Sequence, residues 1–254
     1  MGSVVKAITF DLWDTIIDDN SDEPKRFNLG LRSKREERQY LLYNVISKYH
    51  KISEEEIKIA CAVVDEAFLK CWKEYSITWT YRTRIDILLA GLGLTLPDTE
   101  FETLENSVTN MEIDIFPEKI DGIKSCLVDL SSRYKLCIIS DTIFTPGRGL
   151  RTLLELHGIA QFFSGFAFSD EVGHSKPHID MFKSASKQMG CEINEMIHVG
   201  DRNHNDVVGP QSLGMKAVLF VGKRDDDKTT TSAEAICESH GELPGIIERL
   251  AANG

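Results

Sequence analysis

From residue 117 onward, short apolar runs alternate with helical stretches, and this alternation constrains the fold more than any other feature of the chain. Parallel neighbouring strands need long crossover connections, which are usually helices. The pattern therefore predicts an α/β fold with a doubly wound parallel sheet. The expected strands are 4–10, 135–141, 163–171, 195–201 and 216–222.

Between the first expected strand and the others lies a block without any strand-like run. Apolar residues recur there at spacings of three and four with charges between them, which is typical of amphipathic helices. Ser53 followed by Glu56 forms a capping-box pattern at the start of one helix. We therefore expect an α/β domain of residues 1–27 and 115–254 and an inserted all-helical domain of residues 28–114. The helical stretches are 33–50, 53–75, 83–94 and 96–110.

Charge and composition exclude several classes of partner. The net charge of −11 argues against a surface for nucleic acid or an anionic membrane, although a local basic pocket for an anionic substrate is compatible with it. No apolar run approaches the roughly 20 residues that span a bilayer. The six cysteines are scattered without C-x-x-C spacing, as in a reducing cytoplasm. We expect a cytoplasmic protein with no nucleic-acid or membrane partner, and a homodimer is one candidate assembly.

Polar residues stand where several expected strands end. Asp11 follows the first strand, Ser140 lies in the second, Asp201 ends the strand before "RNHND", and Lys176 lies in a loop ahead of a helix. The carboxyl ends of parallel strands meet at one edge of the sheet, where ligands bind. Carboxylate oxygens suit Mg²⁺, and an ammonium and a hydroxyl suit phosphate oxygens. The sequence therefore predicts a site for a metal cation together with an anion.

Four stretches in this order resemble the loops of the haloacid dehalogenase superfamily. They are "DLWDT" at 11–15, "IIS" ending at Ser140, "SKP" with Lys176, and "GDRNHND" with Asp201 and Asp206. The resemblance covers residues 1–27 and 115–223, and the helical block fits the place and type of the family's helical (C1-type) cap. It implies a Rossmann-like core and a hydrolase.

By this resemblance, Asp11 is the nucleophile and forms a covalent aspartyl intermediate. Thr15 steadies the loop, while Ser140 and Lys176 bind the transferring group and offset its developing charge. Asp141, beside Ser140, is a further substrate-binding candidate, although aspartate at such a position is more often a solvated turn residue.

The resemblance also implies a magnesium site. Asp201 would bind Mg²⁺ together with Asp11 and the backbone carbonyl of Trp13, and Asp206 would contact metal-bound water or Lys176. We therefore expect a Mg²⁺-dependent phosphatase that acts on a small, anionic phosphorylated metabolite through an aspartyl-phosphate.

Trp13 departs from the family's phosphatases, which usually carry an aspartate there as general acid and base. An indole has one N–H donor and does not titrate usefully, so it fills neither role. An aromatic residue at this position is common in metal-independent 2-haloacid dehalogenases, which are one alternative. A catalytically weak metal- and phosphate-binding regulatory domain is the other. Asp14, or a Glu or His of the cap, could replace the missing acid, and Trp13 itself could shape the substrate site.

Two further groups of residues have a structural interpretation that we prefer to a functional one. Loop polarity or core packing accounts for the histidines near the third and fourth motifs, which are His174, His178, His198 and His204. A solvated helix face accounts for the arginines of the helical block, although these could also meet an anionic substrate; they are Arg35, Arg38, Arg82 and Arg84.

Overall fold

The computed structural model describes residues 4–252, and the chain forms two compact units. We call them the α/β unit and the helical unit and describe each by itself. The α/β unit comprises Met1–Asp19, Pro117–Asp141 and Leu154–Gly254, of which residues 1–3 and 253–254 lie outside the description. The helical unit comprises Asn20–Phe116 and Thr142–Leu153.

A parallel sheet of six strands forms the centre of the α/β unit, in the order β3-β2-β1-β4-β5-β6. β1 and β4 are buried along their whole length, as expected of parallel strands covered on both faces. The strand order reverses at β1, which places the ligand-binding edge of such a sheet between β1 and β4. The strands are β1 (Ala7–Phe10), β2 (Lys135–Ser140), β3 (Gly165–Phe168), β4 (Met196–Gly200), β5 (Lys216–Phe220) and β6 (Ala235–Cys237).

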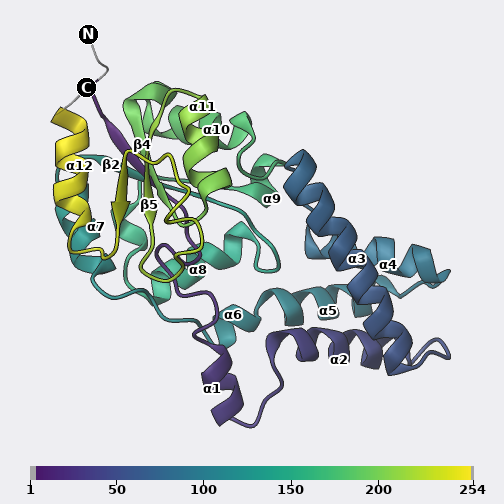
Figure 1. Ribbon diagram of the computed structural model, residues 1–254. Helices are drawn as coiled ribbons and strands as arrows, with labels where there is room; N and C mark the ends of the chain where they lie inside the picture. Colours follow the sequence, from purple (N-terminus) through teal and green to yellow (C-terminus); the bar gives the residue numbers. More distant parts are fainter. Residues whose placement is uncertain (1–3, 253–254) are drawn as a thin grey trace. The chain divides into compact units, whose positions relative to one another are not determined.

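Helices cover both faces of this sheet. Figure 1 shows α7 (Ile123–Ser131) beside α12 (Leu243–Ala252) on one face and α10 (Ile179–Met189) with α11 (Gly209–Ser212) on the other. α10 packs apolar side chains against β2 and β3 around a buried cluster that includes Phe182. The remaining elements are α8 (Gly147–Leu156), which has residues in both units, α9 (Ser169–Val172), and the short turns η1 (Ala160–Phe162), η2 (Ile193–Glu195) and η3 (Asn203–Val208).

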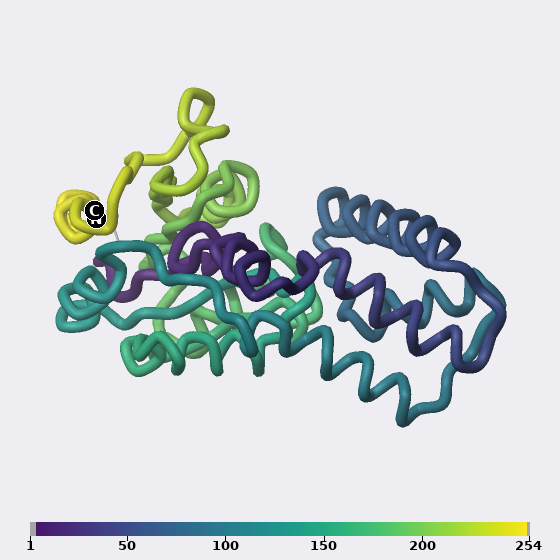
Figure 2. The backbone as a smooth tube through the Cα atoms, turned by 90° about the horizontal axis from the view of Figure 1, so that it is seen from below, coloured from purple at the N-terminus to yellow at the C-terminus, as the bar shows by residue number. Residues whose placement is uncertain are grey.

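Helices build the other unit (Figure 2). Five of them contribute side chains to one apolar core. Ser33 and Ser53 each form a capping box with the glutamate three residues on, which confirms the helix start predicted at Ser53. The helices are α1 (Glu23–Asn28), α2 (Lys34–Ile46), α3 (Glu54–Tyr75), α4 (Tyr81–Leu92), α5 (Asp98–Thr109) and α6 (Met111–Asp114).

The predicted fold class, a doubly wound parallel sheet with an inserted helical part, is confirmed. The helical segment after β4 is not a continuous α-helix, because the π-helix η3 leads into α11, whose first turn contains Pro210. α1, β6 and α12 were not anticipated, and β6 is only three residues long.

The domain division at 27/28 and 114/115 stays a prediction. In the structure, residues 20–27 and 142–153 group with the helical unit. No helix among residues 4–252 is long and apolar enough to cross a membrane. The six cysteines are all free thiols.

A buried charge cluster ties together three segments of the helical unit. The Lys34 ammonium lies 2.9 Å from Asp22 Oδ1 and 3.1 Å from Glu112 Oε1, and the Thr145 hydroxyl donates to Glu112 Oε2 at 2.5 Å. All four residues are buried. Removing one partner from such a cluster leaves uncompensated charge, which is far more costly than breaking an exposed ion pair.

We therefore expect Lys34→Met to lower the free energy of unfolding by about 3–5 kcal/mol, because two buried carboxylates lose the cation that pairs with both of them. The matched control is Lys48→Met, which breaks an exposed pair with Glu100 and should lower it by less than about 1 kcal/mol. Urea denaturation of both variants measures the difference. Equal effects would contradict this account of the cluster.

Candidate functional site

Three strand ends and one loop bring the site residues of the α/β unit together. Asp11 directly follows β1, and its backbone N–H continues the ladder by donating to the Val199 carbonyl of β4 at 2.8 Å. Asp201 directly follows β4, and carboxylate oxygens of Asp11, Asp201 and Asp206 lie within 4.8 Å of one another. All three side chains are buried. The parallel pairing of β1 with β4 therefore produces a compact carboxylate cluster.

Lys176 lies between α9 and α10 and reaches into this cluster. Its ammonium donates to Asp11 Oδ1 at 2.5 Å and to Asp206 Oδ1 at 2.7 Å. Burial alone would lower the pKa of Lys176, but the carboxylates of Asp11, Asp206 and Asp141 outweigh it and raise that pKa. Lys176 is therefore a permanent cation at the centre of the site.

Asp206, in the π-helix η3, has hydrogen bonds to both of its oxygens. Besides Lys176, Oδ1 meets His198 Nε2 at 3.1 Å, and Oδ2 accepts from the Arg202 backbone N–H at 3.0 Å. Burial opposes ionisation, but the Lys176 ammonium and these hydrogen bonds hold the pKa of Asp206 below its usual value. Asp206 is thus an ionised side chain that anchors Lys176.

His198, for which sequence analysis favoured core packing, is part of this network. Burial lowers its pKa and keeps the ring neutral. An ionised Asp206 can only accept, so His198 carries its proton on Nε2 and accepts at Nδ1. The Thr9 hydroxyl lies 2.8 Å from that Nδ1, closer than its 3.3 Å contact with the Ile197 carbonyl, and donates to it. The pattern "HVGD" alone carried no signal for this role.

The carboxylates outnumber the cations in this buried space. Burial raises the pKa of Asp11 well above its usual value despite the opposing charge of Lys176, and the charges of Asp206 and Asp201 add to the rise. Burial, reinforced by Asp206, raises the pKa of Asp201 to about 7. Asp201 Oδ2 is buried and has no hydrogen-bond partner within residues 4–252. An orphaned carboxylate oxygen beside a second acid fits a hard divalent cation such as Mg²⁺.

The loop after β1 places the residues that follow Asp11. Trp13 is half-buried and forms a backbone bridge with Ile17. Asp14 has a left-handed backbone (φ 54°), and its Oδ1 accepts from the Asp19 N–H at 3.3 Å, so this carboxylate braces the turn. Thr15 is fully buried, and its hydroxyl has no hydrogen-bond partner in the described part of the chain.

The second motif lies at the end of β2, next to β1. Ser140 is fully buried, and its hydroxyl contacts the Asp141 carbonyl at 3.2 Å. Asp141 is buried rather than solvated, and its Oδ1 accepts from the Lys176 backbone N–H at 2.8 Å. Asp141 therefore holds the Lys176 loop against the end of β2.

Gly200, before Asp201, has a steric role. A Cβ at this position would lie 2.3 Å from Asp206 Cγ and 2.5 Å from its Cβ, closer than real atoms approach. Asp206 can therefore pack against the end of β4 only because residue 200 has no side chain. Arg224, which sequence analysis did not single out, adds a cation 3.7 Å from Asp201 Oδ2.

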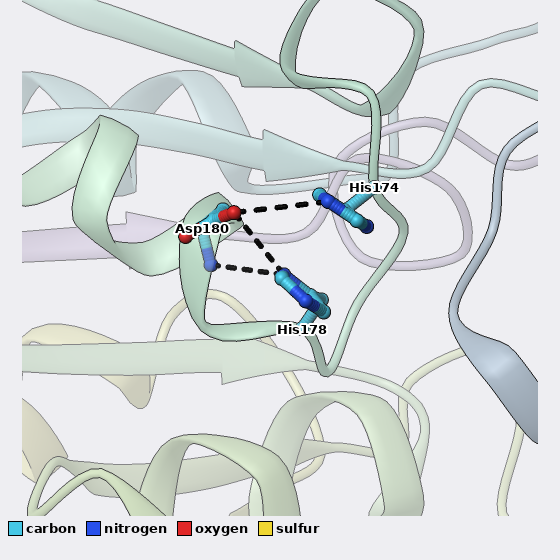
Figure 3. Close-up of side chains that lie close together, drawn as sticks. All are labelled: His174, His178 and Asp180. Atoms are coloured by element: carbon cyan, nitrogen blue, oxygen red, sulfur yellow. Dashed lines mark hydrogen bonds and ion pairs between the residues drawn. The ribbon is translucent and has the colours of Figure 1, made fainter.

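A second cluster of potential ligands lies on the loop around Lys176 (Figure 3). The rings of His174 and His178 stack at 3.7 Å with an angle of 9° between their planes. One ion cannot lie in both of these parallel ring planes, as ring nitrogens require of a metal ligand. His178 Nδ1 also accepts from the Asp180 N–H at 3.2 Å and caps α10. This arrangement supports the structural interpretation of both histidines.

The fold and the carboxylate cluster together define a doubly wound α/β protein with an acidic, cation-suited site at its strand ends. The family model for haloacid dehalogenase-like hydrolases matches residues 8–220. The chain belongs to this family of hydrolases, as the four motifs indicated.

Curated relatives and solved structures agree with this assignment. A glyceraldehyde 3-phosphate phosphatase of Methanothermobacter thermautotrophicus is 38% identical to this chain over 37% of its residues. The matched part covers only 41% of the length of that relative. The protein of the same name from Pyrococcus furiosus is 29% identical over 72% of this chain and 74% of its own. The crystal structure of a HAD phosphatase from Thermococcus onnurineus matches with a TM-score of 0.64 at 23% identity, covering 96% of this chain and 98% of that one, which shows a shared fold.

The raised pKa of Asp201 makes a prediction about stability. A folded-state pKa of about 7, against an ordinary value of 3.8 for an aspartate, means that ionised Asp201 destabilises the folded protein at higher pH. In EDTA at pH 8, Asp201→Asn should therefore raise the free energy of unfolding by about 1–3 kcal/mol, and the gain should fade as the pH falls towards 4.

Thermal denaturation with EDTA and with excess Mg²⁺ measures this effect. Mg²⁺ should stabilise the wild-type protein and do little for Asp201→Asn, because a ligand that binds only the folded state stabilises it. Asp225→Asn removes an exposed acid of the same unit and should behave like wild type. A wild-type melting temperature that Mg²⁺ leaves unchanged would argue against a metal site at Asp201.

Proposed function

We propose that this protein is a Mg²⁺-dependent phosphatase of small phosphorylated metabolites that works through an aspartyl-phosphate on Asp11. The single observation that carries the proposal is the buried cluster of Asp11, Asp201 and Asp206 around Lys176. The phosphatase names of its relatives support the same reaction class.

In this proposal the side chains of the cluster have separate tasks. Asp11 attacks the phosphorus and takes the phosphoryl group, which divides one displacement into two steps. Lys176 offsets the charge of the transferring group, and Ser140 donates a hydrogen bond to it. Asp206, held by His198 and the Arg202 amide, keeps the ammonium in place.

The carboxylates of Asp11 and Asp201 and the backbone carbonyl of Trp13 would hold the magnesium ion. When bound, Mg²⁺ supplies positive charge that reduces the repulsion between the Asp11 carboxylate and the phosphate. Thr15 would hold the loop after β1 in position, so that Asp11 and the Trp13 carbonyl can both reach the ion. The raised pKa values of Asp11 and Asp201 support this assignment, because burial and the neighbouring carboxylates disfavour the ionised form of each and a bound cation would favour it.

Trp13 determines which substrates suit the site. The indole cannot protonate a leaving oxygen or activate the water that hydrolyses the aspartyl-phosphate, steps for which a positioned acid/base contributes roughly 10²–10⁴-fold. Asp14 is a poor replacement, because its carboxylate is hydrogen-bonded to the Asp19 amide. We therefore propose substrates with good leaving groups, such as acyl or aryl phosphates.

A metal-independent 2-haloacid dehalogenase is the second candidate, and Trp13 is the observation that favours it. Halide leaves without a proton, so the missing acid would not matter. Against it stand Asp201 and Asp206, whose charges would oppose the binding of a carboxylate substrate. A catalytically weak binding domain is the third candidate and would keep the metal site without turnover.

Phosphate release from a panel of phosphate esters, with acetyl phosphate included, tests the proposal. We expect turnover that requires Mg²⁺ and is abolished by Asp11→Asn, because the amide neither attacks phosphorus nor supplies charge for the metal. Chloride release from a 2-chloroacid is measured in parallel. Chloride release without phosphate release would favour the dehalogenase, and neither activity with intact metal binding would favour the binding domain.

The same panel examines Trp13. The wild-type rate should fall steeply from acyl and aryl phosphates to alkyl phosphates, because the leaving oxygen departs without a proton donor. Trp13→Asp should reduce this dependence and raise the alkyl phosphate rate, up to roughly 10²-fold. Trp13→Phe, which supplies no acid, is the matched control and should keep the steep dependence. If the wild-type rate depends as little on the leaving group as the Trp13→Asp rate does, another group supplies the proton.

A further inference from the structure

The helical unit contains a small cavity between α2, α3 and α4. Its volume is about 40 Å³, larger than the roughly 10–15 Å³ that one water needs. Leu42, Val64 and Leu88 form an apolar part of its wall. The wall also contains charged and polar side chains, which are Arg35, Arg38, Gln39, Asp65 and Arg84. Of the four arginines that the sequence singled out, only Arg82 is not among the lining residues.

Arg84 is the unusual member of this wall. Its side chain is only 4% exposed, yet Nε and Nη2 have no hydrogen-bond partner among the described residues. The closest carboxylate is Asp65, whose Oδ1 lies 3.5 Å from Nη1. Burial lowers the pKa of Arg84 to about 10, which still leaves the guanidinium charged at neutral pH. Buried, charged and unpartnered donors are costly, so a structural role alone explains Arg84 poorly.

Aromatic rings fix the guanidinium groups in this wall. The Arg84 guanidinium lies 3.7 Å from the Phe68 ring centroid and 4.5 Å from that of Phe144, and the Arg38 guanidinium lies 3.6 Å from Phe144. A guanidinium stacked on a ring keeps its N–H donors at its edges, in the plane of the group. Two arginines therefore contact one phenylalanine ring, and each holds its N–H donors in a fixed plane, which suits a planar or tetrahedral oxyanion.

The charges around the cavity are not balanced. Three arginines face one aspartate, and burial raises the pKa of Asp65, opposing its ionisation. Tyr81 and Cys61, the other titratable groups of the wall, stay neutral because burial raises the pKa of each, to about 12 for Cys61. A protein of net charge −11 thus keeps a local excess of positive charge inside its helical unit.

We propose that this cavity binds a single oxyanion group, carboxylate or phosphate, of a small molecule, and that Arg84 and Arg38 are its main ligands. The unpartnered donors of Arg84 indicate an oxyanion ligand, and so do the two guanidiniums that contact the Phe144 ring. The site lies entirely within the helical unit, so the proposal does not depend on the phosphatase assignment.

The test is calorimetric titration of the metal-free protein, residues 1–254, with sodium phosphate and with sodium acetate. Arg84→Met should weaken the binding of the better probe at least tenfold. Arg82→Met is the matched control, because Arg82 lies in the same helix and pairs with Glu105 on the surface. This substitution should leave oxyanion binding unchanged. Any phosphate that binds in the α/β unit should bind equally well to wild type, Arg84→Met and Arg82→Met, so it does not affect the comparison.

Stability distinguishes loss of binding from loss of folding. Without added oxyanion, Arg84→Met should melt at or above the wild-type temperature, because methionine fills the aliphatic volume and removes unpaired donors. Added probe should raise the melting temperature of wild type and not of Arg84→Met. If this variant fails to fold, Arg38→Met provides the same comparison. No oxyanion binding by wild type, or binding that survives Arg84→Met and Arg38→Met, would overturn the proposal.

The source of the oxyanion is a separate question with its own measurement. If the group belongs to the substrate, Arg84→Met should raise KM for a phosphate ester that carries a carboxylate and not for the same ester without it. If it belongs to another small molecule, both KM values should stay unchanged while phosphate or acetate binding is lost. If the protein is not a phosphatase, the KM comparison cannot be made, but the calorimetric titration still tests oxyanion binding.

Discussion

The site depends on one ammonium group shared by two buried carboxylates. Lys176 lies within hydrogen-bond distance of Asp11 and Asp206, and Asp201 completes a cluster in which acids outnumber the cation. In a buried environment such an excess of negative charge is unfavourable unless a further cation compensates it. Burial, reinforced by the charge of Asp206, raises the pKa of Asp201 to about 7, as expected for an acid in such a cluster. The proposed magnesium site rests on the same imbalance, so stability and the proposed function are linked at these residues.

A second layer of contacts holds this arrangement in place. Thr9 orients His198, His198 and the Arg202 amide orient Asp206, and Asp206 holds Lys176. Thr9 and His198 lie on the neighbouring strands β1 and β4, so the sheet itself positions Asp11, the proposed nucleophile, and its charge partners. Gly200 allows Asp206 to pack against the end of β4. The geometry of the site is therefore a property of the strand pairing as much as of the loops.

Much of this could be predicted from the sequence, for a definite reason. Strand ends of a parallel sheet meet at one edge, so Asp11 and Asp201 could be placed together from the alternation of strands and helices alone. His198 could not, because a neutral histidine inside a strand has the same pattern as a core residue, and its partner Asp206 lies on a π-helix that the sequence pattern did not reveal. Asp141 looked like a solvated turn residue, yet it is buried against the Lys176 loop. Arg84 follows helical periodicity like its exposed neighbour Arg82, and only the packing of α2, α3 and α4 separates them. Side-chain contacts between distant segments are what the sequence pattern does not encode.

In the proposed reaction, Asp11 accepts a phosphoryl group in a site where Trp13 stands in place of an acid/base. Hydrolysis of the aspartyl-phosphate should then be slow, so the intermediate should accumulate. The most direct test is to mix the Mg²⁺-loaded protein with acetyl phosphate, quench with acid and map the phosphoryl group by mass spectrometry. We predict phosphorylation of Asp11 in wild type, less of it in Trp13→Asp and none in Asp11→Asn. A wild-type protein that turns over acetyl phosphate but never carries phosphate on Asp11, or carries it on another residue, would contradict this account.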